Sequence, residues 1–99
     1  MYSFQHSENR VRDSYDFIKK TEEVSTLLKA AESGQRDYII SGKKSYLIPY
    51  NKARTQVNQT LAELESYVKN QDYLKKNFAE LKKNSNLKLA ELEAVLDLY

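Results

Sequence analysis

A long stretch without proline constrains the fold of this chain more than any other feature. Residues 7–40 contain no Pro, and apolar residues recur there every seven positions, with a second position four residues after each of the first three. The repeat consists of Phe17, Thr21, Val24, Leu28, Ala31, Gln35 and Tyr38. This spacing places all seven residues on one face of an α-helix. A single helix of this extent is roughly 50 Å long at about 1.5 Å per residue, and rods of that length pack lengthwise in bundles.

The composition also favours helices and argues against several other fold classes. The chain has 99 residues, of which 30% are charged, with two Gly, one Pro, no Cys and no Trp. So few Gly and Pro residues suit long helices better than sheets and turns. Without Cys there is neither a disulfide framework nor a thiolate site. We therefore expect one small all-α domain with a narrow core, which a second copy of the chain would extend in a homodimer.

Two signals divide the middle of the chain. Gly42 follows the first stretch and can take the left-handed conformation that ends a helix. Pro49 is tolerated only in the first turn of a new helix. We therefore expect a short helical turn, followed by a helix over residues 49–68. The buried face of this helix is predicted to consist of Tyr50, Ala53, Val57, Leu61, Leu64 and Val68.

A last helix is predicted after the polar residues 69–72, with Asp72 as its N-cap. Its buried seam is predicted to consist of Leu74, Phe78, Leu81, Ser85, Leu89, Leu92, Leu96 and Tyr99. Two successive steps of four around Ser85 indicate a stutter in the heptad pattern. The final residues contain no stop signal, so we expect the helix to run to Tyr99 and the chain to be excised from a longer protein. The resulting fold is an antiparallel four-helix-bundle-like domain with three long helices and one short helix.

The charge pattern argues against a nucleic-acid partner and against a membrane span within the chain. The net charge is +2, and the lysines are interspersed with Glu and Asp. This pattern lacks the basic patch that nucleic-acid binding requires. Lysine pairs such as Lys19-Lys20 have acidic neighbours, which favours an ordinary charged exterior over an anion site. No segment approaches the roughly 18–20 consecutive apolar residues of a transmembrane helix.

Residues that commonly carry catalysis are nearly absent. The chain contains one histidine, His6, close to its N-terminus. We expect this side chain to be solvated and not to bind a metal. Adjacent carboxylates such as Glu22 and Glu23 point in different directions around a helix, so they do not form an acid–base pair. The sequence therefore predicts no catalytic residue, no metal and no cofactor.

Gly34 makes the segment over residues 31–42 unusual. A Gly inside a helix costs about 1 kcal/mol relative to Ala, so we expect another helix to approach closely there. Glu32 and Arg36 stand one turn apart and can form an ion pair, either exposed or buried. A buried pair would fix the register between helices and need further hydrogen bonds, for which Gln35 is the candidate.

Three tyrosines gather around the break between the first two helices. They are Tyr38, Tyr46 and Tyr50. A phenol ring has an apolar body and a polar tip, so it suits both the wet end of a thin bundle and a small-ligand pocket. Core packing is the favoured interpretation, and ligand contact remains the alternative.

The segment from residue 32 to 50 resembles the signature of the third type of the CHASE family. In that family an acidic residue, Gly-Gln-Arg, an aromatic residue, two aliphatic residues and Thr/Ser-Gly precede a Tyr-Leu and a Pro-Tyr element. The matching residues here are Glu32, Gly34, Gln35, Arg36, Tyr38, Ile39, Ile40, Ser41, Gly42, Tyr46, Leu47, Pro49 and Tyr50. Asp37 departs from the pattern, since Gly is usual at that position. The resemblance covers roughly residues 24–99.

The resemblance implies a sensory domain on the periplasmic or extracellular side of a bacterial cell membrane. Such a domain is the input of a transmembrane receptor, and a sensor histidine kinase of a two-component system is the expected parent. The membrane would be reached through flanking helices that this chain lacks. The first and last long helices would continue into them and relay the signal by shifting. A homodimer and an unknown small-molecule or protein signal are compatible with this interpretation.

The same residues are compatible with other functions. The parent could instead be a diguanylate cyclase or a chemoreceptor, because nothing in these residues distinguishes the output module. A helical adaptor without membrane flanks would show the same seams, and a lysine-rich nucleic-acid binder is a weaker candidate. The matching motif residues are interpreted first as a structural motif and second as ligand contacts.

Overall fold

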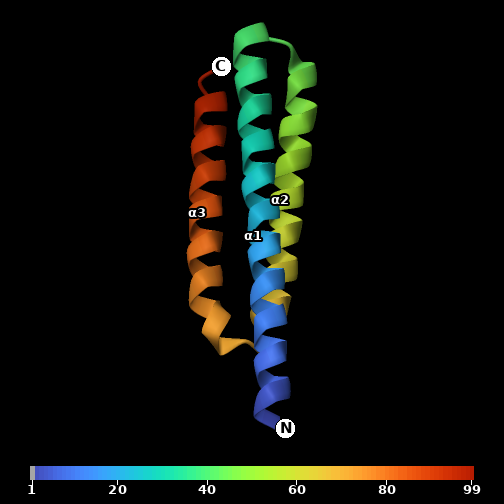
Figure 1. Cartoon of the computed structure of the whole chain (residues 1–99). Coiled ribbons are helices and arrows are strands. Elements are labelled where there is room, and N and C mark those ends of the chain that lie inside the picture. Colours follow the sequence, from blue (N-terminus) through green and yellow to red (C-terminus); the bar gives the residue numbers. More distant parts are fainter. Residues whose placement is uncertain (1) are drawn as a thin grey trace.

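Three long antiparallel helices make up the molecule (Figure 1). The computed structural model describes the backbone of residues 2–99 and the side chains of residues 15–99. In chain order the elements are α1 (Tyr2–Ser41), the 3₁₀ turn η1 (Lys44–Tyr46), α2 (Leu47–Val68) and α3 (Asp72–Leu96). The backbone of residues 2–99 contains no strand. The prediction of an all-α helical bundle is therefore confirmed, with η1 as its short helix.

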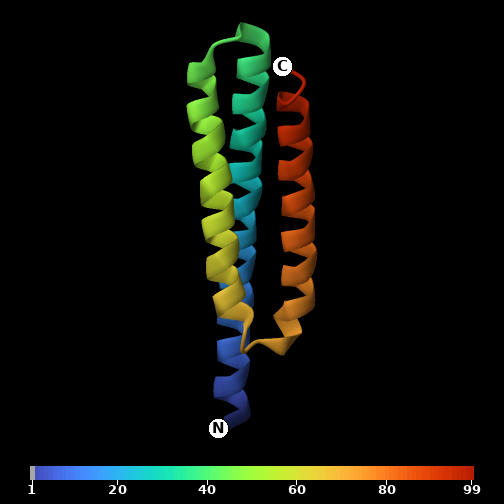
Figure 2. The ribbon, with the colours of Figure 1, turned by 180° about the vertical axis from the view of Figure 1, so that it is seen from behind.

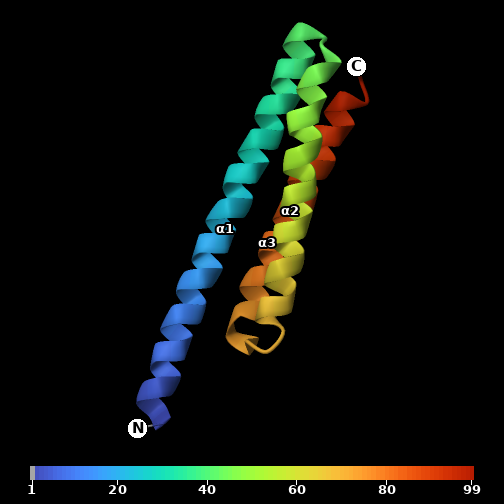
Figure 3. The same ribbon diagram turned by 90° about the vertical axis from the view of Figure 1, so that its right-hand side faces the viewer.

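The bundle is a thin rod with its two chain ends far apart. Its extents are 61 × 17 × 15 Å. Because three helices alternate in direction, α3 ends beside the α1–α2 connection, while α1 begins at the opposite end (Figures 1 and 2). The first turns of α1 project beyond the connection between α2 and α3 (Figure 3).

The connection between α1 and α2 forms as the sequence predicts. Gly42 has a φ of 70°, the left-handed conformation that Gly adopts without steric cost. Its N–H donates a hydrogen bond to the carbonyl of Tyr38 at 2.7 Å, which satisfies one of the free carbonyls at the end of α1. Pro49 is the third residue of α2, within the first turn, where its missing N–H removes no helical hydrogen bond.

Both ends of α3 differ from the sequence prediction. Its N-cap is Gln71, and Asp72 is already the first helical residue, so the predicted Asp72 cap is wrong. Asp72 instead forms an ion pair with Lys75 at 2.9 Å, while its charge still complements the positive end of the helix dipole. At the other end α3 stops at Leu96, three residues before Tyr99. There the N–H of Tyr99 donates to the carbonyl of Leu96, a tightened turn that closes the helix.

The core follows the predicted helix faces closely. All six predicted residues of α2 are buried, as are most of those predicted for α1 and α3. The largest cluster joins all three helices and comprises Phe17, Val24, Val57, Leu61, Leu64, Val68, Leu74, Phe78 and Leu89. A second cluster, nearer η1, comprises Ala31, Tyr50, Ala53 and Leu92. Tyr99, which the seam pattern predicted to be buried, is exposed because α3 has already ended.

Ser85 lies at the predicted stutter of α3 and is 1% exposed. Its hydroxyl oxygen has no hydrogen-bond partner. A buried hydroxyl without a partner lowers stability, because it has lost its hydrogen bonds to water. Ser85 therefore lowers the stability of the fold, whereas Phe78 and Leu89 on the same face of α3 are apolar and buried.

Candidate functional site

The motif residues lie at the end of the bundle formed by η1 and the adjoining turns of α1 and α2. Gly34 allows the close approach that the sequence predicts. A Cβ atom at this position would lie 3.1 Å from the backbone nitrogen of Tyr50 and 3.3 Å from the carbonyl oxygen of Tyr46. Both distances are shorter than ordinary van der Waals contact. The absence of a side chain at Gly34 therefore lets the start of α2 lie directly against α1.

Gln35 connects the motif to α3. It is buried, and its side-chain nitrogen Nε2 donates a hydrogen bond to the backbone carbonyl of Leu92 at 2.9 Å. In this low-dielectric setting such a bond is stronger than it would be in water. Gln35 thus fixes the last turns of α3 against α1. It was predicted to supply hydrogen bonds to a buried ion pair, but it bonds directly to the backbone of α3 instead.

Tyr50 fills the space between the motif and α3. Its side chain is 2% exposed and packs in the cluster with Ala31 and Leu92. Its hydroxyl has no hydrogen-bond partner. Burial raises the pKa of this phenol, and the nearby carboxylates of Glu93 and Asp97 raise it further, against an opposing effect of Arg54. Of the three tyrosines near the break, Tyr50 is the one that is buried in the core.

The other motif tyrosines and Pro49 lie nearer the surface. Tyr38 is half-buried, and Tyr46 and Pro49 are exposed. The three tyrosines therefore lie in different environments, although they come from one end of the bundle. Gly42 is also exposed, and its role is to reverse the chain.

Glu32 and Arg36 form the exposed version of the predicted pair. Their side chains are 38% and 68% exposed, and Arg36 Nη2 lies 3.7 Å from Glu32 Oε1. The alternative of a buried pair that fixes the register is therefore wrong. The same carboxylate group lies 3.7 Å from Lys88 of α3, so Glu32 contributes a solvated contact between helices. Asp37, where the family usually has Gly, is exposed, so its side chain fits there without close packing.

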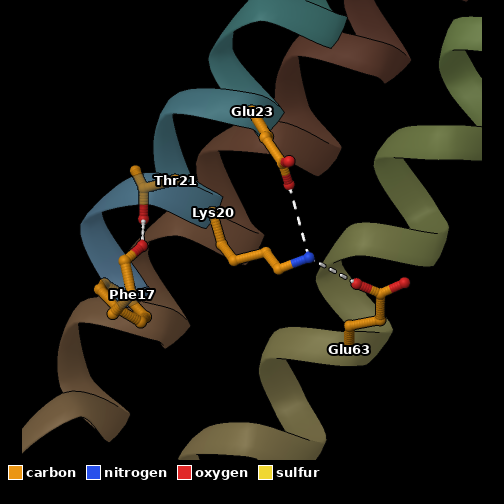
Figure 4. A network of polar contacts seen from close by, with 5 residues as sticks. All are labelled: Phe17, Lys20, Thr21, Glu23 and Glu63. Atoms are coloured by element: carbon orange, nitrogen blue, oxygen red, sulfur yellow. Dashed lines mark hydrogen bonds and ion pairs between the residues drawn. The ribbon is translucent and has the colours of Figure 1, made fainter. Parts of the chain in front are cut away.

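A second polar network joins α1 to α2 in the other half of the bundle (Figure 4). Lys20 Nζ lies 3.0 Å from Glu63 Oε2 and 3.6 Å from Glu23 Oε2. The hydrogen bond to Glu63 raises the pKa of Lys20, with a partial opposing effect of burial. The side chain of Thr21 points away from this network, and its hydroxyl donates a hydrogen bond to the carbonyl of Phe17 at 2.9 Å (Figure 4).

The ion pair between Lys20 and Glu63 joins two helices and was not predicted from the sequence. Arg54 of α2 and Glu93 of α3 form another such pair at 2.9 Å. Helical spacing predicts only partners within four residues of each other, so it carries no signal for them. Within the described residues, the side chains of His, Cys, Asp and Glu form no group of three that could hold a metal ion. The side chain of His6 lies outside the described residues.

The comparisons with known proteins bear on this arrangement. The family model described as "CHASE3 domain" matches residues 7–99, which include all the motif residues. A search of curated proteins found no significant match, and neither did a search of solved structures. In the described part of the chain, no helix is long and apolar enough to cross a membrane. The match covers most of the chain, which therefore belongs to the CHASE3 domain family, a family of extracellular sensory domains of bacterial receptors.

Proposed function

We propose that this chain is the input domain of a bacterial transmembrane receptor, with a sensor histidine kinase as the parent protein. In this proposal the domain lies outside the cytoplasm and has no catalytic activity of its own. The observation that carries the proposal is the family match over residues 7–99. The motif supports it as well, because Gly34 and Gln35 join all three helices at one end of the rod.

The positions of the chain ends refine the proposed mechanism. The sequence led us to expect that the first and last long helices both continue into the membrane. Within residues 2–99, α1 begins at one end of the rod and α3 ends at the other, so these two helix ends do not reach the same end of the bundle (Figures 1 and 3). A membrane next to the start of α1 also lies next to the α2–α3 connection. For both flanks to enter the same membrane, we propose a further segment that returns along the bundle, about 25 residues if it is helical and matches α3.

A signal would then travel along the rod. The motif end, where Gln35 holds α3 against α1, is the end far from the membrane in this proposal. A change in the position of α3 relative to α1 would be transmitted towards the membrane by the rigid helices. Packed helices shift between discrete arrangements and do not deform continuously, which suits a switch.

The first experiment is to determine the native reading frame on both sides of the chain and to score its hydropathy. The expected result is an apolar segment of about 20 residues on each side. We also expect the reading frame to encode a helical return segment between Tyr99 and the second span, and a kinase module beyond that span. A cyclase or chemoreceptor module there would change the output but keep the sensory role. Absence of both spans would overturn the receptor proposal and favour a helical adaptor.

A topology assay tests the same proposal in the cell. Alkaline phosphatase, which is active only outside the cytoplasm, is fused after Tyr99 in the native gene. Green fluorescent protein is fused at the same position as the matched control. We expect phosphatase activity and no fluorescence, and the reverse result would place the domain in the cytoplasm.

A further inference from the structure

A groove runs between α1 and α3 in the half of the bundle that contains the α2–α3 connection. Its volume is about 570 Å³. The buried side chains of Phe17 and Leu74 and the half-buried Leu81 form its floor. Ile18 and Tyr73 also line it and are 57% and 40% exposed, respectively. Apolar side chains at the bottom of a groove give a ligand with an apolar body a surface on which to pack.

The charged residues on the walls of this groove are acidic. Glu22 of α1 and Glu80 of α3 line it, together with the amides of Asn77 and Asn84. Among the described residues, no lysine or arginine lines it. Among the ion pairs of residues 15–99, none involves either of these two glutamates. Neither carboxylate is therefore engaged in an ion pair with another described residue, so both can contact a ligand in the groove.

Three other grooves lined by residues 15–99 lack this combination. Two grooves beside α2 are lined by Lys19 and Lys20 as well as by glutamates, and Lys20 pairs with Glu63 there. A groove between α2 and α3 is lined by Lys69 and Lys75. Positive charge on the walls of these three grooves would repel a cation, which favours the α1–α3 groove among the four.

We propose that the α1–α3 groove binds an organic cation with an apolar body, such as a protonated or quaternary amine. The apolar part would lie on Phe17 and Leu81, and the ammonium group would lie near Glu22 and Glu80. Aromatic rings such as those of Phe17 and Tyr73 attract cations through their negative faces. This inference rests on the proposed sensory function and adds the chemical class of the signal.

The location of the groove suits a sensor. A ligand in it contacts both α1 and α3, in the half of the rod away from the hydrogen bond between Gln35 and Leu92. A ligand that prefers one arrangement of these two helices shifts the population towards that arrangement. The groove thus links a binding event to the relative position of the helices that the proposed mechanism uses.

The test is a nuclear magnetic resonance titration of the ¹⁵N-labelled chain with benzyltrimethylammonium chloride. Benzenesulfonate and benzyl alcohol, which carry the same ring with a negative charge and with no charge, serve as matched probes. We expect saturable shifts at Thr21, Asn77 and Asn84 with the cation, and binding at least tenfold weaker for both other probes. The factor of about ten corresponds to about 1.4 kcal/mol, which contacts with both exposed carboxylates can supply together.

Variants identify the carboxylates responsible. In Glu22→Gln with Glu80→Gln the affinity for the cation should fall at least about tenfold. The control Asp37→Asn with Glu91→Gln removes the same charge from exposed positions of α1 and α3 outside the groove, and should bind like the unmodified chain. Circular dichroism melting establishes that each variant is folded, and Glu80→Gln alone provides a milder second variant.

The outcomes separate this inference from the proposed function. Absence of shifts, shifts centred elsewhere, equal binding of benzenesulfonate, or equal loss in the control variant would each overturn the cation site. None of these results bears on whether membrane spans flank the chain. Conversely, binding as expected with no flanking spans would leave the site intact and overturn the receptor proposal.

Discussion

Gly34 and Tyr50 determine how α1 and α2 meet at the scale of single residues. The first removes a side chain where the backbones touch, and the second fills the space beside that contact. Their effects on stability have different physical causes, which are steric for Gly34 and electrostatic for Tyr50.

The substitution Gly34→Ala should lower the free energy of unfolding by about 1 kcal/mol. Its Cβ would meet the backbone of Tyr50 and Tyr46 at 3.1 and 3.3 Å. Overpacking of this kind costs about 1–3 kcal/mol, which exceeds the gain of about 1 kcal/mol in helix propensity. Urea unfolding followed by circular dichroism measures the change. The control Ser33→Ala lies on an exposed position of the same helix, and a Gly34→Ala variant as stable as this control would contradict the prediction.

The substitution Tyr50→Phe should raise the free energy of unfolding by about 1 kcal/mol at pH 7, because it removes a buried hydroxyl that has no partner. Thermal unfolding of the variant beside Tyr15→Phe, which alters an exposed tyrosine, measures this effect. A loss of stability in Tyr50→Phe would indicate that the hydroxyl does make a favourable contact.

The pH dependence of stability provides a second test of Tyr50. Its pKa in the fold is raised from 10.0, so above that pH the unfolded chain loses the proton while the folded chain keeps it. Stability therefore falls as pH rises through and above 10.0. Lys20, whose pKa is raised from 10.5, adds a fall in the same direction. In Tyr50→Phe only the Lys20 part should remain, so unfolding curves between pH 9 and about 11 should show a shallower decline.

At the scale of elements, α3 is the helix whose position depends on specific polar groups. Gln35 fastens its end to α1, while Ser85 weakens its middle. Substitution should lower the free energy of unfolding at Gln35 and raise it at Ser85.

The substitution Gln35→Glu should lower the free energy of unfolding by roughly 2 kcal/mol at pH 7. It replaces a buried donor by a carboxylate that faces the carbonyl of Leu92. The loss should shrink at low pH, because a protonated carboxyl can donate to that carbonyl. Chemical unfolding at pH 4 and pH 7 measures both effects. The control Gln56→Glu, at an exposed position of α2, should change little, and equal losses in the two variants would contradict the role of Gln35.

The substitution Ser85→Ala should raise the free energy of unfolding by about 1 kcal/mol, since it deletes a buried hydroxyl without a partner. Ser66→Ala, at an exposed helical position, measures the helix-propensity part of the gain. The difference between the two variants is the effect of burial. A difference of zero would show that the Ser85 hydroxyl is satisfied in solution.

At the scale of the whole molecule, an odd number of antiparallel helices separates the chain ends. The chain has no Cys, so spin labels can be attached to introduced cysteines without other changes. Labels at Lys44 and Tyr99 should be close, and labels at Asp16 and Tyr99 should be roughly 38 Å apart, the length of 25 helical residues. Pulsed electron resonance measures both distances. Similar distances for the two pairs would contradict the arrangement of α3.

Helix positions and core faces could be predicted because they depend on local spacing. The repeat through Phe17 and Val24 and the face through Val57 and Leu64 follow from 3.6 residues per turn. Gly42 also follows from a local rule, the preference of Gly for a left-handed C-terminal residue. The error at Asp72 is one of a single residue, at a helix boundary that depends on how the chain enters the helix.

The family signature was equally visible in the sequence, but the roles of its residues were not. Gly34 was predicted to allow close approach, yet its partner Tyr50 became known only from the packing. Gln35 and Leu92 are 57 positions apart. No rule of helical spacing connects residues so distant in sequence.

The sequence by itself determined the helices, the faces they bury, the turn at Gly42 and the family, because these depend on residue type and spacing along the chain. Only the tertiary structure decided which side chains meet across helices. One example is the hydrogen bond that Gln35 donates to the carbonyl of Leu92. Another is the groove that Glu22 and Glu80 both line. The physical reason is that contacts between helices depend on their rotation and axial offset, which many weak contacts set together and no local pattern records.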